Sequence, residues 1–332
     1  MKNVLNYLVL GIIFTLIGWY LNVAYHLPKS SNNPITKVIP KPLEKYSIEN
    51  LSNQDFEGGE IKIGKVIKDD PTFASYEFSL QFSPDFSNNL KTTTGLINIP
   101  KGSGSFPIVV MYRGYADQKQ YFTGQGTQRA GEYFAKNGFV TISPDFLGYA
   151  GSDEESENIF ESRFQTYVTA LNTLESVKTL DKWDKENIFI WGHSNGGQIA
   201  LTVLEISGVN YPTVLWAPVT KPFPYSILYY TDESDDHGKL IRSELSKFED
   251  LYDVEKYSLT NYLDRIKAPL SLYQGTNDDA VPFAWSDSLN KNLNSKNIDI
   301  EYHKYPGADH NLNPDWNLVI NSSLSFFNKY LQ

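Results

Sequence analysis

Hydrophobic and polar residues alternate in three stretches of the N-terminal third of the chain. Residues 60–67, 76–82 and 94–99 place apolar side chains at about every second position. This period of two is typical of antiparallel strands that bury one face and expose the other. The pattern therefore predicts three antiparallel strands ahead of the central part of the fold.

Further along, the chain contains short and nearly continuous apolar runs, which are typical of strands buried on both faces. These runs lie at 108–112, 139–142, 188–191, 213–216 and 270–273. Segments of helix length lie between and after them, at about 127–137, 157–180, 196–207, 282–294 and 315–331. Strands and helices that alternate in this way predict a right-handed, doubly wound α/β fold with a mostly parallel sheet. In such sheets the chemistry gathers at the carboxyl ends of the strands.

One interval interrupts the alternation of strands and helices. Residues 219–266 form a connection far longer than the usual one between a strand and its neighbour. The interval is rich in aromatic and acidic residues and has a helical pattern near 238–256. It predicts a small helical cap over the functional site. The alternative is a surface insertion that makes no contact with a substrate.

The N-terminus carries a long apolar stretch. No charged residue occurs from Asn3 to Tyr25, and apolar side chains dominate between Leu5 and Leu21. About 20 such residues in a helix span roughly 30 Å of hydrocarbon. The stretch predicts an uncleaved transmembrane anchor at 1–25, which would bind the lipid bilayer. A cleaved signal peptide and a buried helix are the alternatives.

Residues 26–57 follow the predicted anchor and include four prolines, at positions 28, 34, 40 and 42. Prolines among serine, asparagine and lysine favour a stiff, extended tether. We therefore expect a tether at 26–57 and a folded domain at 58–332. Because a long domain can translocate regardless of the flanking charges, we expect it on the extracytoplasmic side of the membrane.

Composition excludes several classes of chemistry. The 332 residues carry a formal net charge of -10 and no cysteine. The negative charge argues against a nucleic-acid partner, because phosphate binding needs a basic surface. The lack of cysteine excludes thiol nucleophiles and disulfides. No phosphate-binding loop, dinucleotide fingerprint or cluster of metal ligands is present in the sequence, so we expect no cofactor and no metal.

A Gly-x-Ser-x-Gly motif lies between a predicted strand and a predicted helix, with Ser194 at its centre and glycine at 192 and 196. A nucleophile on a sharp strand-to-helix turn sits in strained backbone, so the residues two positions away must lack side chains. The helix that follows would stabilise developing negative charge through its N-terminus. The motif predicts Ser194 as a nucleophile, with an ordinary glycine-rich turn as the alternative.

A serine nucleophile needs a base within hydrogen-bond reach and a third group that orients the base. His310 lies in a turn-rich loop after the strand-like stretch 298–305, where it suits the role of general base. The other histidines after position 190 lie in that strand (His303), in the acidic interval (His237) and in the turn itself (His193). The orienting acid is expected after the run 270–273, where Asp278 and Asp279 are both candidates.

Three stretches together, 192–196, 275–282 and 306–310, resemble the α/β-hydrolase superfamily. The likeness covers about 58–332 and is greatest to the serine esterases that are similar to prolyl oligopeptidase and dienelactone hydrolase. It implies that Asp278, the first acid of a Gly-x-x-Asp-x-x-Val-Pro stretch, is the acid of a Ser-His-Asp triad. It also implies that Asp145 and Gly148 shape the loop after a central strand without taking part in chemistry.

An oxyanion hole in this family needs two backbone donors. One is expected from Asn195, directly after the nucleophile, and the other from Tyr115, in the loop after the first buried strand. The family usually has His-Gly-x in that loop, whereas this chain has Arg113-Gly114-Tyr115. The backbone donor is kept, but the side chain that anchors the loop differs.

The resemblance implies a serine hydrolase that cleaves a carboxylic ester through an acyl-enzyme. A membrane-anchored peptidase or aminopeptidase that acts on short peptides is the first alternative. The segment between the anchor and the core is too short for the large β-propeller of full-length prolyl-oligopeptidase-type enzymes. A catalytically inactive binding module on the same fold is the second alternative.

Overall fold

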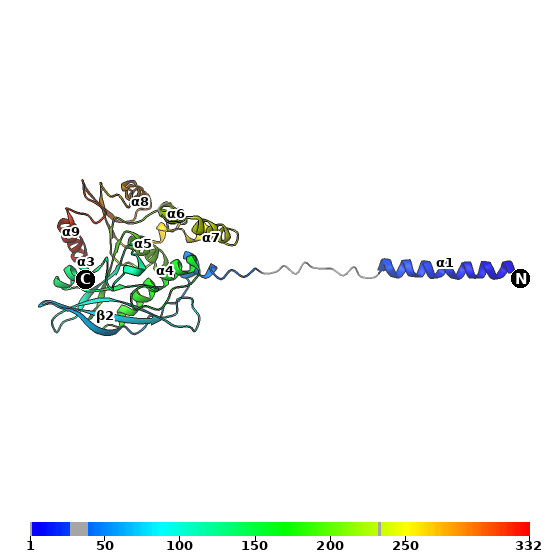
Figure 1. Cartoon of the computed structure of the whole chain (residues 1–332), viewed down its shortest axis with the longest axis horizontal. Coiled ribbons are helices and arrows are strands. Elements are labelled where there is room, and N and C mark those ends of the chain that lie inside the picture. The colour runs from blue at the N-terminus through cyan, green and yellow to red at the C-terminus, as the bar shows by residue number, and fades with distance from the viewer. Residues whose placement is uncertain (1, 27–38, 232–233) are drawn as a thin grey trace. The chain divides into compact units, whose positions relative to one another are not determined.

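A computed structural model of the chain describes residues 2–26, 39–231 and 234–332. These residues belong to two compact units, Met1–Pro40 and Lys41–Gln332. The first unit contains helix α1 (Lys2–His26), and the second contains the sheet and the helices that flank it (Figure 1).

The second unit is built on a nine-stranded sheet. Its strands are β1 (Lys62–Asp69), β2 (Phe73–Phe82), β3 (Lys91–Pro100), β4 (Phe106–Tyr112), β5 (Val140–Pro144), β6 (Trp183–His193), β7 (Thr213–Trp216), β8 (Leu270–Gly275) and β9 (Ile300–Tyr305). The longer helices are α3 (Gln128–Lys136), α4 (Ile159–Ser176), α5 (Asn195–Ser207), α8 (Phe283–Ser295) and α9 (Trp316–Lys329). Each predicted strand and helix of the central fold is therefore confirmed, with ends that move by a few residues.

The strand order is β1-β2-β3-β5-β4-β6-β7-β8-β9. The pairs from β1 to β3, and β3 with β5, are antiparallel, and the remaining pairs are parallel. The order reverses at β4, which has β5 on one side and β6 on the other. The predicted doubly wound arrangement is confirmed, and the carboxyl ends of β4, β6, β8 and β9 lie at one edge of the sheet.

Helices cover both faces of the sheet and divide the core into two large clusters. On one face, α3 and α9 pack on the side chains of the central strands, and Phe327 of α9 contacts both Phe134 of α3 and Phe189 of β6. On the other face, α4, α5 and α8 bury residues such as Val168, Leu201 and Leu293. Central strands with both faces covered explain why their sequences are nearly continuous apolar runs.

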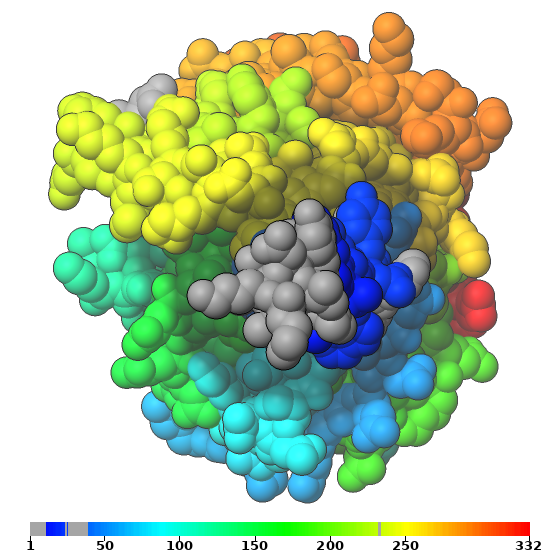
Figure 2. Space-filling view, turned by 90° about the vertical axis from the view of Figure 1, so that its right-hand side faces the viewer, coloured from blue at the N-terminus to red at the C-terminus, as the bar shows by residue number. Residues whose placement is uncertain are grey.

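The interval 219–266 is helical, as the sequence predicts. It contains α6 (Tyr225–Thr231), α7 (Lys239–Glu249) and short 3-10 turns between Val254 and Arg265. Phe248 and Tyr257 pack on Phe160 and Phe164 of α4, with ring centroids 5.1 Å apart for Phe160–Phe248 and 4.8 Å apart for Phe164–Tyr257. Figure 2 shows the yellow surface of this interval above the green surface around α4. The interval thus packs on α4, and its role as a cap over the functional site stays a prediction.

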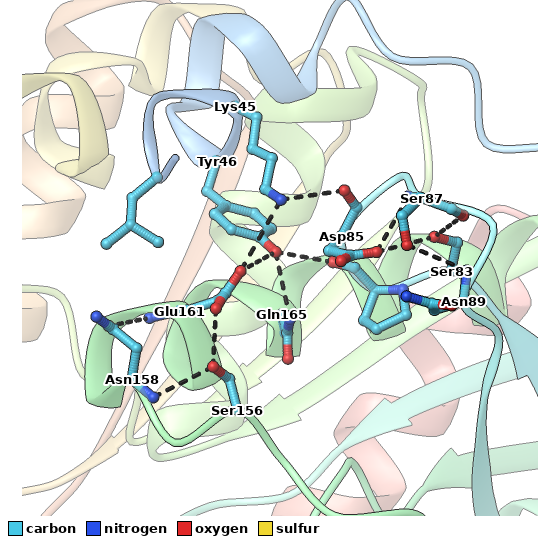
Figure 3. Close-up of polar contacts among 12 residues, drawn as sticks. Lys45, Tyr46, Ser83, Asp85, Ser87, Asn89, Ser156, Asn158, Glu161 and Gln165 are labelled. Carbon is cyan, nitrogen blue, oxygen red and sulfur yellow. Dashed lines mark hydrogen bonds and ion pairs between the residues drawn. The ribbon is translucent and has the colours of Figure 1, made fainter. Parts of the chain in front are cut away.

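Residues 41–57 belong to the second compact unit, and their assignment to the tether is corrected. The side chains of Tyr46 and Leu51 are fully buried. The Tyr46 hydroxyl donates to Glu161 Oε1 at 3.0 Å and accepts from Gln165 Nε2 at 3.3 Å, both on α4 (Figure 3). The backbone N–H of Leu43 donates to the Tyr252 hydroxyl of the cap at 3.0 Å. The partners in these contacts lie far along the chain, and the local sequence does not reveal them. The prolines nearby therefore led to the prediction of a tether. The rest of the predicted tether, 27–38, lies outside the described residues.

Helix α1 occupies the segment predicted as a membrane anchor. A membrane-spanning helix needs about 20 predominantly apolar residues. In the part of the chain that the structure describes, no helix has the length and apolar character to cross a bilayer. The structure therefore does not support the predicted anchor or its contact with lipid, and the extracytoplasmic location stays a prediction from the sequence.

Candidate active site

Ser194 lies on a sharp turn between β6 and α5. Its backbone angles, φ 57° and ψ -122°, lie in a region that residues other than glycine rarely adopt. A Cβ atom on Gly196 would lie 1.9 Å from the carbonyl oxygen of Tyr112, and one on Gly192 would lie 2.5 Å from the carbonyl oxygen of Gly196. Only glycine fits at either position, so the structure shows the strained turn that the motif predicts.

Asp278 and His310 form a hydrogen-bonded pair at the ends of neighbouring strands. His310 Nδ1 lies 2.9 Å from Asp278 Oδ2. The Asp278 side chain is fully buried, and the His310 side chain is 17% exposed. Asp279, the alternative acid, is exposed. The structure thus pairs His310 with the acid that the family resemblance indicates.

Hydrogen bonds hold the Asp278 carboxylate in its ionised form. Oδ1 accepts from the backbone N–H groups of Ala280 and Val281, at 2.9 and 2.8 Å, and Oδ2 also accepts from Gln274 Nε2 at 2.8 Å. Burial alone would raise the pKa of Asp278, but the hydrogen bonds from His310 and Val281 outweigh burial and lower it. An ionised carboxylate accepts a hydrogen bond from the protonated Nδ1 of His310. Nε2 is then unprotonated and can accept a proton from a nucleophile.

The loops that carry Asp278 and His310 are fixed to each other by their backbones. Gly275 and Tyr305 are partners in the β8–β9 ladder. Just beyond them, the N–H of Asn277 donates to the carbonyl of Ala308 at 3.0 Å. A Cβ on Gly275 would lie 2.2 Å from that carbonyl oxygen, so glycine allows the two loops to approach closely. The close approach sets the distance between the acid and the histidine.

His193 joins the Asp278–His310 pair to the turn at Ser194. Its Nε2 lies 3.0 Å from the backbone carbonyl oxygen of His310, and the two rings are 4.8 Å apart. Burial, together with the nearby His310 ring, lowers the pKa of His193 to about 4. At neutral pH the ring is therefore neutral, and Nε2 must carry the proton, because a carbonyl oxygen can only accept one. His310 is thereby held beside the residue that precedes Ser194.

The loop after β4 lies against Ser194 from the other side. In the β4–β6 ladder Tyr112 pairs with Gly192, which brings the ends of the two strands together. A Cβ on Gly114 would lie 3.0 Å from Ser194 Cβ and 3.5 Å from its hydroxyl oxygen. The N–H of Tyr115 follows Gly114, and Asn195 is the first residue of α5, where an N–H has no acceptor within the helix. Both expected oxyanion donors thus belong to backbone next to Ser194.

Arg113 takes the place of the histidine that is usual in this loop. Its side chain is buried, and it donates from Nη1 to the carbonyl of Gly114 at 2.9 Å and from Nη2 to the carbonyl of Asp145 at 3.0 Å. The guanidinium carbon lies 3.9 Å from the ring centroid of Tyr149 and 4.6 Å from that of Tyr121. These contacts fix the loop through two carbonyls and two aromatic faces.

Asp145 organises the loops around Arg113, as the sequence predicts. Its buried carboxylate accepts from Thr94 Oγ1 and from the Tyr121 hydroxyl, each at 2.7 Å. Burial raises the pKa of Asp145 in spite of these hydrogen bonds. Gly148 adopts φ 81° in the turn that follows, which glycine allows. Asp145 thus joins β3, through Thr94, to the loop that carries Tyr121.

The contacts of three residues of this site are not evident from the sequence. His193 and Gln274 support the His310 and Asp278 side chains, and Arg113 holds the loop with Tyr115. The only signal is their position, since each lies at the carboxyl end of a central strand. Their partners are backbone carbonyls or residues of a neighbouring loop, which a motif does not specify.

Comparison with known proteins identifies the family. The model of the prolyl oligopeptidase family matches residues 127–332, more than half of the chain. The chain belongs to the prolyl oligopeptidase family. The match favours a serine hydrolase of the α/β-hydrolase type over the inactive binding module.

Curated relatives include both esterases and peptidases. The acetyl esterase Axe7A of Xylanibacter ruminicola is 23% identical over 212 residues, which cover 57% of this chain and 46% of that protein. Dipeptidyl aminopeptidase BIII of Pseudoxanthomonas mexicana is 24% identical over 266 residues, which cover 77% of this chain and 36% of that protein. The chain spans less than half the length of these relatives.

Solved structures confirm the fold. An acetyl xylan esterase from Paenibacillus sp. R4 has a TM-score of 0.65 and 19% identity, and the match covers 86% of this chain and 92% of that chain. Dipeptidyl peptidase 4 of Porphyromonas gingivalis has a TM-score of 0.51 and 18% identity, with coverage of 85% and 37%. The predicted α/β-hydrolase fold is therefore confirmed.

Proposed function

We propose that this serine hydrolase cleaves carboxylic esters with Ser194 as nucleophile, His310 as general base and Asp278 as the orienting acid. The observation that carries the proposal is the 2.9 Å hydrogen bond between His310 Nδ1 and Asp278 Oδ2, beside the strained turn of Ser194. In this reaction His310 Nε2 takes the hydroxyl proton as Ser194 Oγ attacks the ester carbonyl. The ester carbonyl oxygen gains the negative charge.

The N–H groups of Asn195 and Tyr115 are the donors proposed to bind that oxyanion. Each such donor contributes about 3 kcal/mol to the stabilisation of a tetrahedral intermediate. Collapse of the intermediate transfers the proton from His310 to the leaving alcohol and gives an acyl-enzyme. Water then attacks the acyl-enzyme, with His310 again as base, and restores Ser194.

The relatives support an ester as the substrate and leave one alternative. The esterase relative is named for acetyl esters, and a solved acetyl xylan esterase matches this chain over 92% of its own length. The aminopeptidase relative matches over 36% of its length, so most of that protein has no counterpart in the alignment. Because it aligns with 77% of this chain, hydrolysis of short peptides is the second candidate.

Replacement of Ser194 by alanine tests the proposal. We expect p-nitrophenyl acetate hydrolysis to fall to background in Ser194→Ala, with unchanged circular dichroism and no labelling by a fluorophosphonate. Ser288→Ala is the matched control, since the Ser288 hydroxyl bonds only to a carbonyl of its own helix at the surface. Retention of near-full turnover in Ser194→Ala would exclude this nucleophile. Turnover of aminoacyl p-nitroanilides without turnover of esters would replace the ester assignment by the peptidase.

A further inference from the structure

A cavity of about 640 Å³ opens beside the proposed oxyanion donors. Its lining includes Tyr115 and Asn195, the loop 116–119, and side chains of α4 such as Arg163. Pockets of this size are typical of sites for organic ligands far larger than an acetyl group. The cavity therefore has room for a substantial part of a substrate.

The position of the cavity indicates which part of an ester it would hold. The leaving oxygen must face His310 to receive its proton, and the carbonyl oxygen must face Asn195 and Tyr115. Tyr115 and Asn195 both line the cavity, whereas His310 is not among the described residues that do. An ester bound in this way directs its acyl chain, and not its alcohol, into the cavity.

The acidic side chains of the cavity are engaged within the protein. Glu155 accepts from Gln118 Nε2 at 2.6 Å through Oε1 and from the Ser162 hydroxyl through Oε2. Asp117 accepts from the backbone N–H of Lys119 at 2.8 Å. Both carboxylates thus accept hydrogen bonds from other groups of the protein, so neither needs a hydrogen-bond donor from a ligand.

The cations of the cavity have unused donors. Arg163 donates from Nη2 to Gln198 Oε1 at 3.0 Å, its Nε is buried without a partner, and among the described residues its Nη1, which is not buried, has no acceptor and can serve a ligand. In the described part of the chain, no carboxylate lies within 4.0 Å of Arg163 or of Lys119. Gln198 lies one helical turn after Ser194 on α5, and Arg163 lines the same cavity as Asn195, the residue after the nucleophile. A partly buried guanidinium without a counter-ion is suited to bind a carboxylate in a bidentate manner.

We propose that the acyl part of the substrate carries a carboxylate, which Arg163 binds on the wall of this cavity. The substrate class is then the half-esters of dicarboxylic acids and related acidic acyl esters. This inference rests on the proposed ester hydrolysis, and it goes further by naming the group that selects the substrate.

Pairs of esters that differ only in the terminal group test the proposal. The p-nitrophenyl half-esters of adipate and suberate carry the carboxylate, and p-nitrophenyl hexanoate and octanoate are the neutral esters of equal chain length. We expect kcat/KM of the wild-type protein to favour the acidic ester of at least one pair by about 10-fold or more. Preference for the neutral ester in both pairs would overturn the proposal.

Variants of Arg163 assign the preference to this side chain. In Arg163→Gln the acidic-to-neutral ratio of kcat/KM should fall by about 10-fold to 100-fold, because a charge-assisted pair is lost. Arg163→Lys should lie between the two, since it keeps the charge and loses the planar fork. Arg129→Gln is the matched control, because Arg129 is exposed, lies over the Trp316 ring and is outside this cavity. If Arg163→Gln slows the acidic and the neutral ester equally, the ratio of their kcat/KM values is unchanged. Arg163 would then serve packing only, and the proposal would be overturned.

The outcome is separable from the proposed function. Ester hydrolysis that depends on Ser194 but ignores the terminal carboxylate contradicts this inference alone. Absence of ester hydrolysis contradicts the proposed function, and inhibition of fluorophosphonate labelling by adipate then still measures carboxylate binding. If Arg163→Gln does not fold, the wild-type selectivity and the Arg163→Lys ratio decide the matter.

Discussion

The two sides of Ser194 differ in how far their polar groups are paired. On the His310 side, Asp278 accepts hydrogen bonds from His310, Gln274, Ala280 and Val281. On the opposite side, two arginines each have a buried Nε without a partner, Arg113 behind the loop with Tyr115 and Arg163 on the cavity wall.

This difference follows from what each side has to do. A proton relay needs fixed orientation, and a closed set of hydrogen bonds provides it before a substrate binds. Stabilisation of negative charge needs positive charge that the protein has not already neutralised. Arg113 and Arg163 donate to uncharged carbonyl oxygens, which do not neutralise their charge. We therefore infer that negative charge arrives or develops on this side during turnover.

The largest effect is expected on the paired side, from Asp278→Asn. The amide can donate to His310 Nδ1 and so favour the wrong tautomer, in which Nε2 carries the proton and cannot act as base. We expect kcat to fall by about 10⁴-fold with the fold intact. Steady-state kinetics with p-nitrophenyl acetate measures the loss. Asp279→Asn is the matched control, and an equal loss there would contradict the choice of acid.

On the unpaired side, we expect Arg113→Met to lower kcat by about 100-fold with a smaller change in KM. The loss reflects a displaced Tyr115 N–H, since removal of one oxyanion donor costs about 10²- to 10³-fold. Arg113→Lys should recover part of the rate, because it keeps the charge and one donor. A change in KM alone in Arg113→Met would show that the loop binds substrate without serving the transition state.

The sequence was sufficient for those parts of the site that depend on local backbone geometry. The turn at Ser194 needs glycine on both sides, and the loops of Asp278 and His310 follow strands that the apolar runs reveal. Such features depend on residues that are neighbours in the sequence, so a sequence motif detects them. The mostly parallel sheet and the helices that cover it were predictable for the same reason, because buried parallel strands have a distinct composition. The order of the strands in the sheet was not predicted.

What the sequence did not reveal depends on contacts between distant residues. His193 meets the carbonyl of His310, 117 positions away. Tyr46 is buried against Glu161 of α4, although the surrounding prolines suggested a tether. In each case burial is decided by a segment that is far along the chain, and no local pattern specifies it.

A finer test of the paired side is His193→Phe. An aromatic ring is kept, but the His310 carbonyl loses its donor, and we expect kcat to fall by about 10-fold. His303→Phe is the matched control, since His303 lies in β9 and stacks on Tyr273 with ring centroids 4.8 Å apart. An equal loss in both variants would mean that general packing, and not the hydrogen bond to His310, is measured.

The same variant changes how stability depends on pH. The pKa of His193 is lowered by folding, from an ordinary value near 6.5 to about 4. The unfolded chain therefore binds a proton that the folded chain does not, and stability is lost as pH falls from about 6.5 towards 4. In His193→Phe this loss should be smaller, as urea unfolding across that range would show. An identical acid dependence in the two proteins would contradict a buried, neutral His193.

The smallest effect on activity is expected from Glu205→Met, at the far end of α5. Glu205 is fully buried, and neither carboxylate oxygen has a hydrogen-bond partner. Unlike Arg163, it is not among the described residues that line the cavity beside Ser194. An unpartnered group away from the site should weaken the fold and leave the chemistry untouched, so turnover by Glu205→Met should equal that of the wild type.

The effect of Glu205→Met on stability has a definite pH dependence. Burial raises the pKa of Glu205 well above its ordinary value, although the charge of Arg265 opposes the shift. Because folding raises this pKa, the stability is complete below the ordinary value, about 4.5, and is lost as pH rises towards the folded value. Methionine cannot ionise, so the variant should gain about 1 kcal/mol or more at pH 8 and less at pH 5. Urea unfolding at the two pH values measures the gain. A loss of turnover in Glu205→Met would contradict this comparison. A buried group without a partner would then affect catalysis even where it lies away from the cavity.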